Sequence, residues 1–292
     1  MEPFEKEIYR HYFRVGNLSF RKTAPRSVSL DFLIENYDAF FFDAFGTFYA
    51  QKETLYPGAL EMYQKVRKSR KPMRLVTNPA SSAPSEMMKS LSRMQIPFDA
   101  SEIVSSGSLF EDFARENGIR EAFYVGRPGG AFFLERAGVR ISENPSENTV
   151  IVSARGKEDS LFERAKEILL SEGSRLVVLN PDAWAPRIGS PREGVSGAYA
   201  HRLLTETHAR AFYFGKPFRP IFEKALGTLP RPMKTVMIGD TLATDVGGAM
   251  NAGMDAALLV GRNEPAEELS EDEEFLGLRP DFYLAEDRKS VV

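Results

Sequence analysis

The sequence contains no cysteine, no long apolar run and no excess of basic residues. Without cysteine, disulfide bonds, thiolate metal sites and cysteine nucleophiles are excluded. No stretch approaches the ~18 consecutive apolar residues that a membrane-spanning helix needs, and the N-terminus lacks the apolar segment of a signal peptide. The net charge of −3 gives no broad basic field for nucleic acid. We therefore expect a cytoplasmic protein that binds neither membranes nor nucleic acid.

The length of the chain predicts two compact units. Its 292 residues exceed the size of a typical domain, which has roughly 100–200 residues. The chain is 42% hydrophobic and 27% charged, which are the proportions of an ordinary globular protein. Apolar strand-like segments alternate with stretches of helical spacing from residue 37 to residue 260. This alternation predicts an α/β fold, with a parallel sheet that has helices on its faces.

The middle of the chain reads as an insertion. Its strand-like segments, 122–126, 148–154 and 175–180, are interleaved with helical stretches and could form a smaller α/β layer. From the segment 211–217 onward, the alternation of strands and helices seen before the insertion begins again. We therefore predict a core of residues 1–108 plus 208–292 and an inserted α/β cap of residues 109–207.

Two stretches outside this pattern have no predicted function. Residues 1–30 carry scattered aromatic side chains and indicate either an irregular arm or one short helix. The acidic run 264–274 is typical of a solvated helix face or a loop.

Polar side chains follow four of the strand-like segments. In open parallel sheets, ligands bind at the carboxyl ends of strands, so one site would collect these residues. They are Asp43, Thr77 with Asn78, Lys216, and Asp240 with Asp245. Taken singly, each has an ordinary explanation as a helix cap, a turn residue or a surface lysine. Their joint occurrence at four strand ends favours a common site.

These residue types suit a metal ion and a phosphate group. Three carboxylates match the hard oxygen ligands of Mg²⁺, so we predict Mg²⁺ as the cofactor. An Asp beside Mg²⁺ can act as the nucleophile that forms an aspartyl phosphate, with a lysine stabilising the charge of the transferred group. Asp43 and Lys216 are therefore the predicted catalytic residues. Thr77 and Asn78 are predicted to donate hydrogen bonds to phosphate oxygens, and Gly46 would let the loop backbone approach the ligand closely.

The ordered set of motifs resembles a known family. The segments 43–47, 77–78, 215–217 and 239–245 are similar to the four motifs of the haloacid dehalogenase (HAD) superfamily. The long insertion, with its segments 180–186 and 189–198, resembles the class IIA members, which include NagD-type nucleotide and sugar phosphatases and 4-nitrophenylphosphatase-like enzymes. The resemblance spans roughly residues 37–262. It implies a Rossmann-like core that carries a C2-type cap, with the chemistry at their interface.

The resemblance also implies a role for each matching residue. Asp43 would be the nucleophile and a Mg²⁺ ligand, Asp240 the second carboxylate ligand, and Asp245 would orient metal-bound water. The main-chain carbonyl of Phe45 would supply a further metal ligand. The same resemblance has Thr77 and Lys216 hold the transferred phosphoryl group, while Asn78 supports the loop.

Phe45 departs from the family pattern, because phosphatases of this family usually carry a second Asp at this position. Such an acid–base residue contributes roughly 10²–10⁴-fold, so its loss predicts slow hydrolysis of alkyl phosphates and spares substrates with stable leaving anions. Phe45 could instead only pack against the cap or core. Haloacid dehalogenases carry an aromatic residue here, but a halide reaction has no use for Mg²⁺.

Three functions follow in order. The first is a Mg²⁺-dependent phosphatase that acts on a small phosphorylated metabolite such as a sugar phosphate or nucleotide. The second is a binding protein that keeps the phosphate pocket with little turnover, and the third is a dehalogenase. Asp182 and Trp184, in the inserted region, are predicted to contact the substrate, although Asn-Pro-Asp also forms turns and a lone Trp usually packs. The only protein partner that we include among the expectations is a second copy of this chain, in a homodimer.

Overall fold

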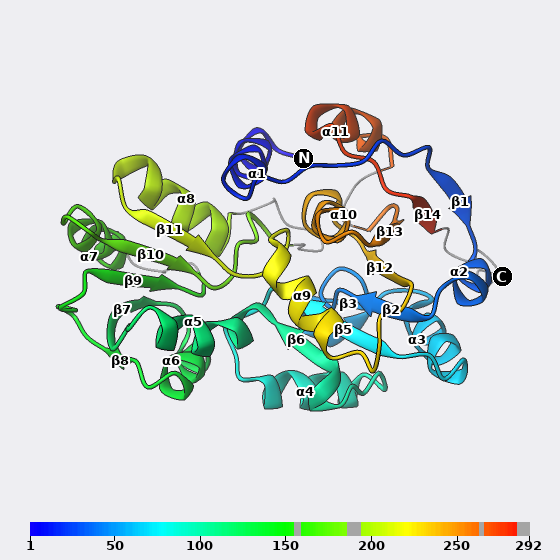
Figure 1. Ribbon diagram of the computed structural model, residues 1–292, viewed down its shortest axis with the longest axis horizontal. Helices are drawn as coiled ribbons and strands as arrows, with labels where there is room; N and C mark the ends of the chain where they lie inside the picture. The colour runs from blue at the N-terminus through cyan, green and yellow to red at the C-terminus, as the bar shows by residue number, and fades with distance from the viewer. Residues whose placement is uncertain (155–158, 186–193, 263–265, 285–292) are drawn as a thin grey trace.

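The computed structural model describes residues 1–154, 159–185, 194–262 and 266–284 and contains two parallel sheets side by side (Figure 1). The strands are β1 Arg26–Val28, β2 Ala39–Phe42, β3 Tyr49–Ala50, β4 Thr54–Leu55, β5 Met73–Thr77, β6 Ile103–Ser105, β7 Glu121–Val125, β8 Arg140–Ile141, β9 Thr149–Val152, β10 Arg175–Val178, β11 Arg210–Tyr213, β12 Thr235–Gly239, β13 Asp255–Leu259 and β14 Phe282–Leu284. The helices are α1 Pro3–Val15, α2 Leu30–Asn36, α3 Ala59–Lys68, α4 Pro84–Arg93, α5 Phe110–Glu116, α6 Phe132–Arg136, α7 Asp159–Leu169, α8 Ser196–Glu206, α9 Arg219–Gly227, α10 Gly247–Asn251 and α11 Leu269–Leu276.

The larger sheet has seven strands in the order β1-β14-β13-β12-β2-β5-β6, and the smaller has five in the order β11-β10-β9-β7-β8. All strand pairs in these two sheets are parallel. A short antiparallel hairpin, β3 with β4, follows β2. The predicted α/β class, a Rossmann-like parallel sheet with an additional α/β layer, is confirmed.

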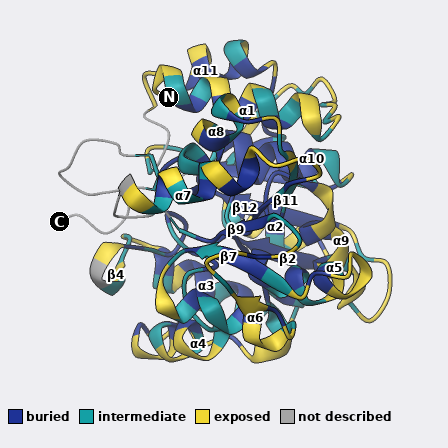
Figure 2. Cartoon of the chain, turned by 90° about the vertical axis from the view of Figure 1, so that its left-hand side faces the viewer, coloured by how far each residue is buried: buried dark blue, intermediate teal, exposed yellow. Residues whose placement is uncertain are grey.

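The central strand β2 shows why this sequence forms a buried sheet. Its side chains point alternately to opposite faces. Phe40 and Phe42 pack with α3 and the neighbouring strands in one hydrophobic cluster, whereas Phe41 packs with α9 and α10 in another. All three rings are fully buried, and burial of each contributes about 1.5–3 kcal/mol. Figure 2 shows the buried strands lying between helices whose outer faces are exposed.

The smaller sheet is covered on both faces in the same way. Phe123 and Val125 of β7 pack with α7 and α8, while Ala122 of the same strand packs with α5 and α6. Two independent hydrophobic clusters therefore hold this layer together.

One strand lies in a different sheet from the one the sequence analysis assigned. Residues 211–217 were predicted to resume the core, but β11 pairs with β10 in the smaller sheet, from Arg175 opposite Arg210 to Val178 opposite Tyr213. The chain leaves this strand at Tyr213 and only then returns toward the larger sheet. The prediction was wrong for this strand because a strand of four residues, only three of them apolar, does not specify which sheet it joins. The other boundaries of core and cap stay a prediction.

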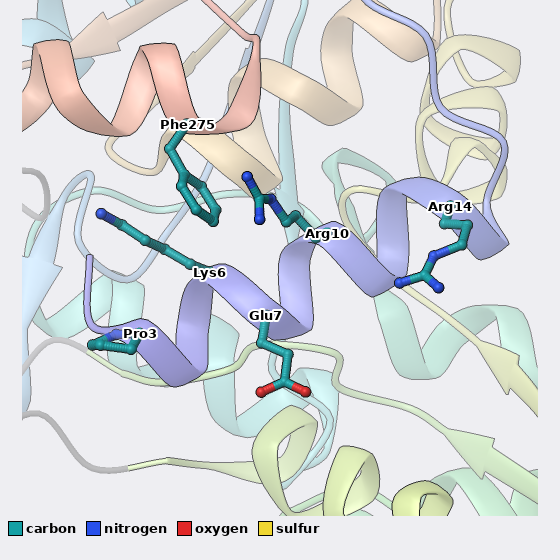
Figure 3. Close-up of a pocket in the computed structure, with 6 residues that line it drawn as sticks. All are labelled: Pro3, Lys6, Glu7, Arg10, Arg14 and Phe275. Carbon is teal, nitrogen blue, oxygen red and sulfur yellow. The ribbon is translucent and has the colours of Figure 1, made fainter.

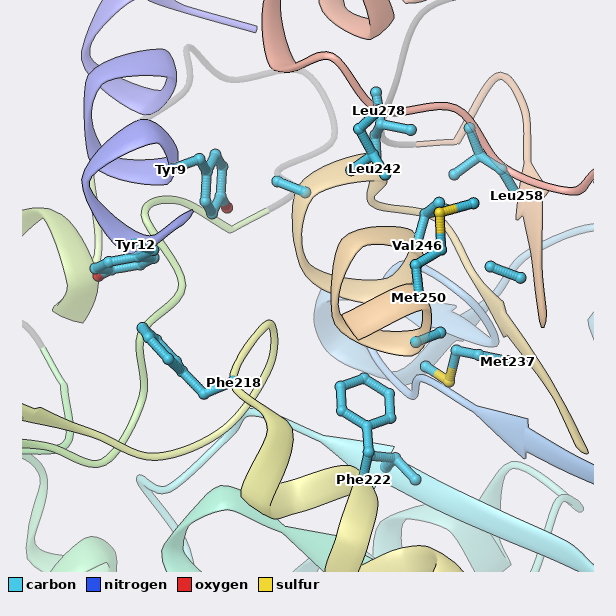
Figure 4. Packing of buried hydrophobic residues seen from close by; sticks show 14 of the residues in the cluster. Tyr9, Tyr12, Phe218, Phe222, Met237, Leu242, Val246, Met250, Leu258 and Leu278 are labelled. Atoms are coloured by element: carbon cyan, nitrogen blue, oxygen red, sulfur yellow. The ribbon is translucent and has the colours of Figure 1, made fainter. Parts of the chain in front are cut away.

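The first 30 residues contain a helix and a strand. Helix α1 packs against α8 beside the smaller sheet and against α11 beside the larger one. Figure 4 shows Tyr9 and Tyr12 of this helix near Phe218, and the rings of Tyr12 and Phe218 lie 5.4 Å apart. The strand β1 forms an edge of the larger sheet. A short-helix interpretation of this region was thus correct for residues 3–15.

Helices α1 and α11 border an open cavity of about 420 Å³ (Figure 3). It is lined by Pro3, Lys6, Glu7, Arg10, Arg14 and Phe275. None of these is a predicted site residue. Among the described residues, no helix is long and apolar enough to cross a membrane. The predicted acidic run falls partly on α11, and its residues 264 and 265 lie outside the described residues.

Candidate active site

The site lies where β2, β5 and β12 end at the same edge of the larger sheet. Phe42 of β2 pairs with Ile238 of β12, so Asp43 and Asp240 leave two neighbouring strands close together. The backbone N–H of Asp43 donates to the carbonyl of Ile238 at 3.1 Å, which extends the ladder to the site itself. Parallel pairing therefore brings together two carboxylates that are almost 200 positions apart in the chain.

Three carboxylates form a buried cluster. One oxygen from each of Asp43, Asp240 and Asp245 lies within 4.8 Å of the others, and the three residues are 8%, 1% and 1% exposed. Oδ1 of Asp240 accepts a hydrogen bond from the hydroxyl of Thr47 at 3.0 Å. Oδ2 of Asp240 is buried and has no hydrogen-bond partner among the described residues. An unpartnered oxygen in a cluster of hard donors fits a divalent cation, because isolated buried anions are costly.

Asp245 is held by its own backbone turn. It lies in a π-helical turn, Leu242–Val246, and its Oδ2 accepts hydrogen bonds from the N–H groups of Asp240 and Thr241 at 3.1 and 3.0 Å. Its Oδ1 accepts a hydrogen bond from the ammonium of Lys216 at 2.6 Å. Both oxygens are therefore engaged, and the carboxylate is fixed in one orientation.

Lys216 joins two of the carboxylates. Its Nζ lies 2.6 Å from Oδ1 of Asp43 and 2.6 Å from Oδ1 of Asp245, and the side chain is 2% exposed. Burial alone would lower the pKa of this ammonium, but the facing carboxylates of Asp245 and Asp43 outweigh burial and raise the pKa above its ordinary value. Lys216 therefore stays protonated and supplies a fixed positive charge beside Asp43.

Burial shifts the other carboxyl groups in the opposite sense. It raises the pKa of Asp245 to about 6, against the lowering effect of Lys216. Burial, together with the charges of Asp245 and Asp43, also raises the pKa of Asp240 well above its ordinary value. Carboxyl groups that resist ionisation in the absence of a cation are expected where a cation belongs.

Thr77 and Asn78 end β5, the strand beside β2. The hydroxyl of Thr77 is buried, and no described residue is its hydrogen-bond partner, so it can donate to a ligand. The amide of Asn78 is occupied: Oδ1 accepts from the backbone N–H of Lys216 at 2.7 Å, and Nδ2 donates to the carbonyl of Lys216 at 3.0 Å and to Asp182 at 2.7 Å. Asn78 thus holds the backbone of Lys216 by two hydrogen bonds. These bonds agree with the supporting role that the family resemblance implies for Asn78. Its predicted donation to a phosphate stays a prediction.

The inserted region contributes one of its two predicted residues to this edge of the sheet. Asp182 is half-buried and accepts the hydrogen bond from Asn78. The pKa of Asp182 is raised to about 7, and burial is the largest cause. The charges of Asp43 and Asp245 also raise this pKa, whereas Asn78 and Lys216 lower it. Trp184 is 8% exposed and packs in the hydrophobic cluster that contains α1. Packing therefore accounts for its position, and its contact with a substrate stays a prediction.

The side chain of Phe45 is half-buried and packs edge-on against Tyr49, with the ring centroids 5.7 Å apart. This contact agrees with the packing interpretation. Its carbonyl as a metal ligand stays a prediction.

Two residues of the site were not among those predicted. Thr47 hydrogen-bonds Asp240, and Ser106 donates to the carbonyl of Asn78 at 2.5 Å. Thr47 lies inside the first motif, and Ser106 directly follows β6, so the strand-end rule that found the other residues applies to Ser106 as well.

Two family models match the sequence. A haloacid dehalogenase-like hydrolase model matches residues 40–140, and a HAD-hydrolase-like model matches residues 213–287. The first match extends into the inserted region, to residue 140, and the second begins after that region. Together they include every residue of the acidic cluster and Lys216.

Curated relatives and solved structures agree with these matches. The chain is 26% identical to the haloacid dehalogenase-like hydrolase domain-containing protein 2 of Bos taurus, over 77% of this chain and 85% of the relative. It is 25% identical to an acid sugar phosphatase of Staphylococcus haemolyticus, over 82% of this chain and 92% of the relative. A crystal structure from Cytophaga hutchinsonii, described as a "possible sugar phosphatase, HAD superfamily", is similar in fold. Its TM-score is 0.80 at 23% identity, and the match covers 89% of this chain and 98% of that one.

Proposed function

Because this chain belongs to the haloacid dehalogenase-like hydrolase family, we propose that it is a Mg²⁺-dependent phosphatase of small phosphorylated metabolites. The observation that carries the proposal is Lys216, whose buried ammonium bridges Asp43 and the acidic cluster. A fixed positive charge beside a nucleophilic carboxylate suits the transfer of a dianionic phosphoryl group. The acid sugar phosphatase among the relatives supports the same class of substrate.

Each residue of the site has a proposed part in the reaction. Asp43 attacks the phosphorus atom and forms an aspartyl phosphate, which water then hydrolyses. Lys216 and the free hydroxyl of Thr77 hold the phosphoryl oxygens, while Asn78 keeps the Lys216 backbone in place. Burial of the cluster excludes bulk water and strengthens each of these interactions.

The acidic cluster is the proposed Mg²⁺ site. Its ligands would be the carboxylates of Asp43 and Asp240 and the main-chain carbonyl of Phe45. Asp245 would not bind the cation directly but would orient the water bound to it. When bound, the cation would neutralise the negative charge that the carboxylates and a phosphate bring together.

A small substrate agrees with the space beside the site. A cavity of about 480 Å³ is lined by Tyr49, Pro79, Met87 and several polar side chains. None of the predicted site residues lines it, but Tyr49 packs against Phe45 and Pro79 directly follows Asn78. Small-molecule sites typically have volumes of roughly 300–1,000 Å³. We further propose that the protein is cytoplasmic and that it binds neither nucleic acid nor membranes. The assembly to test is a homodimer.

The test is turnover of p-nitrophenyl phosphate by the purified protein, with Mg²⁺ and with a chelator. We expect turnover only with Mg²⁺, and none from Asp43→Asn. Asp31→Asn is the matched control, because Asp31 is 61% exposed on α2 and pairs only with Lys65 among the described residues. Release of halide from a 2-haloacid without metal would favour the dehalogenase instead. Tight phosphate binding without turnover would favour the binding protein.

A further inference from the structure

Cleavage of an alkyl phosphate needs a proton donor, because an alkoxide is a poor leaving group. The residue two positions after the nucleophile is Phe45, which has no proton to give. Four carboxyl groups of the described residues belong to the site or interact with it. Asp43, Asp240 and Asp245 form the acidic cluster, and Asp182 interacts with Asn78 by a hydrogen bond and with Asp43 and Asp245 by charge. A carboxyl group is a common general acid, so these four are the candidates for supplying the proton to an alkyl leaving group.

Three of the four are already committed. Asp43 is the nucleophile, and its Oδ1 faces the ammonium of Lys216. Asp240 has its unpartnered oxygen in the acidic cluster. Both oxygens of Asp245 accept hydrogen bonds, from Lys216 and from two backbone N–H groups. None of these carboxyl groups is available to a leaving group.

Asp182 is the carboxyl group that remains. Its Oδ1 accepts the hydrogen bond of Asn78, which fixes the side chain, whereas the described residues donate no hydrogen bond to its Oδ2. The loop that carries it is anchored to the first turn of α8, because the N–H of Gly197 donates to the Asp182 carbonyl at 2.8 Å. A side chain at position 197 would meet that carbonyl oxygen at 2.5 Å, so the loop and the helix touch directly. Asp182 is thus held at its Oδ1 and at its backbone, and within the described part of the chain its Oδ2 accepts no hydrogen bond.

We propose that Asp182, contributed by the inserted region, is the acid–base residue of this site. The proposal rests on the phosphatase function proposed above. In the first step, Asp182 gives its proton to the bridging oxygen as the bond from that oxygen to phosphorus breaks and an Asp43 oxygen bonds to phosphorus. In the second step, the Asp182 carboxylate takes a proton from the water that attacks phosphorus. The bond between phosphorus and Asp43 then breaks, inorganic phosphate leaves, and Asp182 is protonated again.

The protonation state of Asp182 agrees with this role. An ordinary Asp is ionised at neutral pH, but burial and the nearby carboxylates of Asp43 and Asp245 raise the pKa of Asp182 to about 7, against Asn78 and Lys216. From α1, the phenol of Tyr12 faces the same region, and burial and the charge of Asp182 raise the Tyr12 pKa. Both forms of Asp182 are therefore populated near neutrality, as an acid that also acts as a base requires.

The experiment compares Asp182→Asn with the wild-type full-length protein and Mg²⁺. The asparagine side chain still accepts the hydrogen bond from Asn78, but it cannot transfer a proton. We expect kcat/KM for an alkyl phosphate such as glycerol phosphate to fall about 10²–10⁴-fold. The kcat/KM for p-nitrophenyl phosphate, whose leaving anion needs no proton, should stay within about threefold. Asp112→Asn, an exposed position on α5 of the same inserted region, is the control and should change neither.

A rescue variant and the pH profile complete the test. Adding Phe45→Asp to Asp182→Asn should restore alkyl phosphate turnover, because it places a carboxyl two residues after the nucleophile. In the wild type, kcat/KM for the alkyl phosphate should fall as the pH rises above about 7, and this limb should vanish in Asp182→Asn. An equal loss for both substrates, or no loss for either, would overturn the acid–base role and leave Asp182 as a positioning residue at most. If the wild type fails to turn over p-nitrophenyl phosphate, the phosphatase function itself falls, and this role with it.

Discussion

The ammonium nitrogen of Lys216 lies 2.6 Å from a carboxylate oxygen of Asp245, and both side chains are almost completely buried. The desolvation of two charges offsets much of their attraction, so such a pair contributes little to stability when intact. Removing one partner is costly, because it leaves the other charge buried without compensation. The pair therefore links the stability of the fold to the chemistry of the site.

Lys216→Met tests this link. In the variant, Asp43 and Asp245 face each other without a cation, so we expect the free energy of unfolding to fall by about 3–5 kcal/mol in a chelator. The pKa of Asp245 is already raised to about 6, and loss of the ammonium raises it further. A carboxyl whose pKa is higher in the fold destabilises it increasingly as the pH rises from about 4. The loss should therefore be smaller at pH 5 than at pH 8 in urea unfolding. A loss that is equal at both pH values would contradict this account.

The proposed Mg²⁺ site predicts that Mg²⁺ stabilises the folded protein, because the three carboxylates come together only in the fold. At a concentration 100 times the Kd, the expected gain is about 2.7 kcal/mol. Asp240→Asn should abolish the gain, since it removes the carboxylate whose Oδ2 has no hydrogen-bond partner in the described part of the chain. Thermal unfolding with increasing Mg²⁺ measures the effect, and Asp31→Asn should respond like the wild type. A gain that survives in Asp240→Asn would place the cation elsewhere.

Gly46 leaves no room for a side chain next to the acidic cluster. It has a φ of +96°, and a Cβ there would lie 2.1 Å from Oδ2 of Asp240. We expect Gly46→Ala to lower Mg²⁺ affinity and kcat/KM together, because the Asp240 carboxylate must move. Gly58→Ala is the control: it has a φ of +73° and open space around its Cβ position. It should cost about 1–2 kcal/mol of stability from backbone strain alone, with unchanged Mg²⁺ affinity.

The strand ends of the larger sheet could be predicted because their signal is local. An apolar run that ends in a polar residue, such as residues 39–42 followed by Asp43, predicts a buried strand and its carboxyl end wherever the strand lies in the sheet. The short strands β1, at the edge of the sheet, and β14, beside it, have three residues each and carry no such signal. The sheet to which β11 belongs could not be predicted either, because a strand with only three apolar residues does not specify its neighbouring strand.

The polar contacts of the site depend on distances in space that the sequence does not encode locally. Asn78 and Asp182 are separated by 104 positions, and nothing near either residue indicates that their side chains meet. The sequence therefore predicted Asn78 as a phosphate donor from its type alone. Only the fold shows that its amide is already engaged with Asp182 and Lys216.

Thr77 offers a test in which activity and stability should change in opposite senses. Its hydroxyl is buried and has no partner among the described residues, so it contributes nothing to the fold and is costly to bury. Thr77→Val keeps the shape and removes the hydroxyl, so the free energy of unfolding should stay the same or rise. If the hydroxyl binds the transferred phosphoryl group, kcat/KM for p-nitrophenyl phosphate should fall about 10²–10³-fold, the usual effect of losing one such donor. Thr77→Ser keeps the hydroxyl and should retain most activity despite the lost methyl group. Equal activity of the valine and serine variants would show that the hydroxyl does not contact the phosphoryl group.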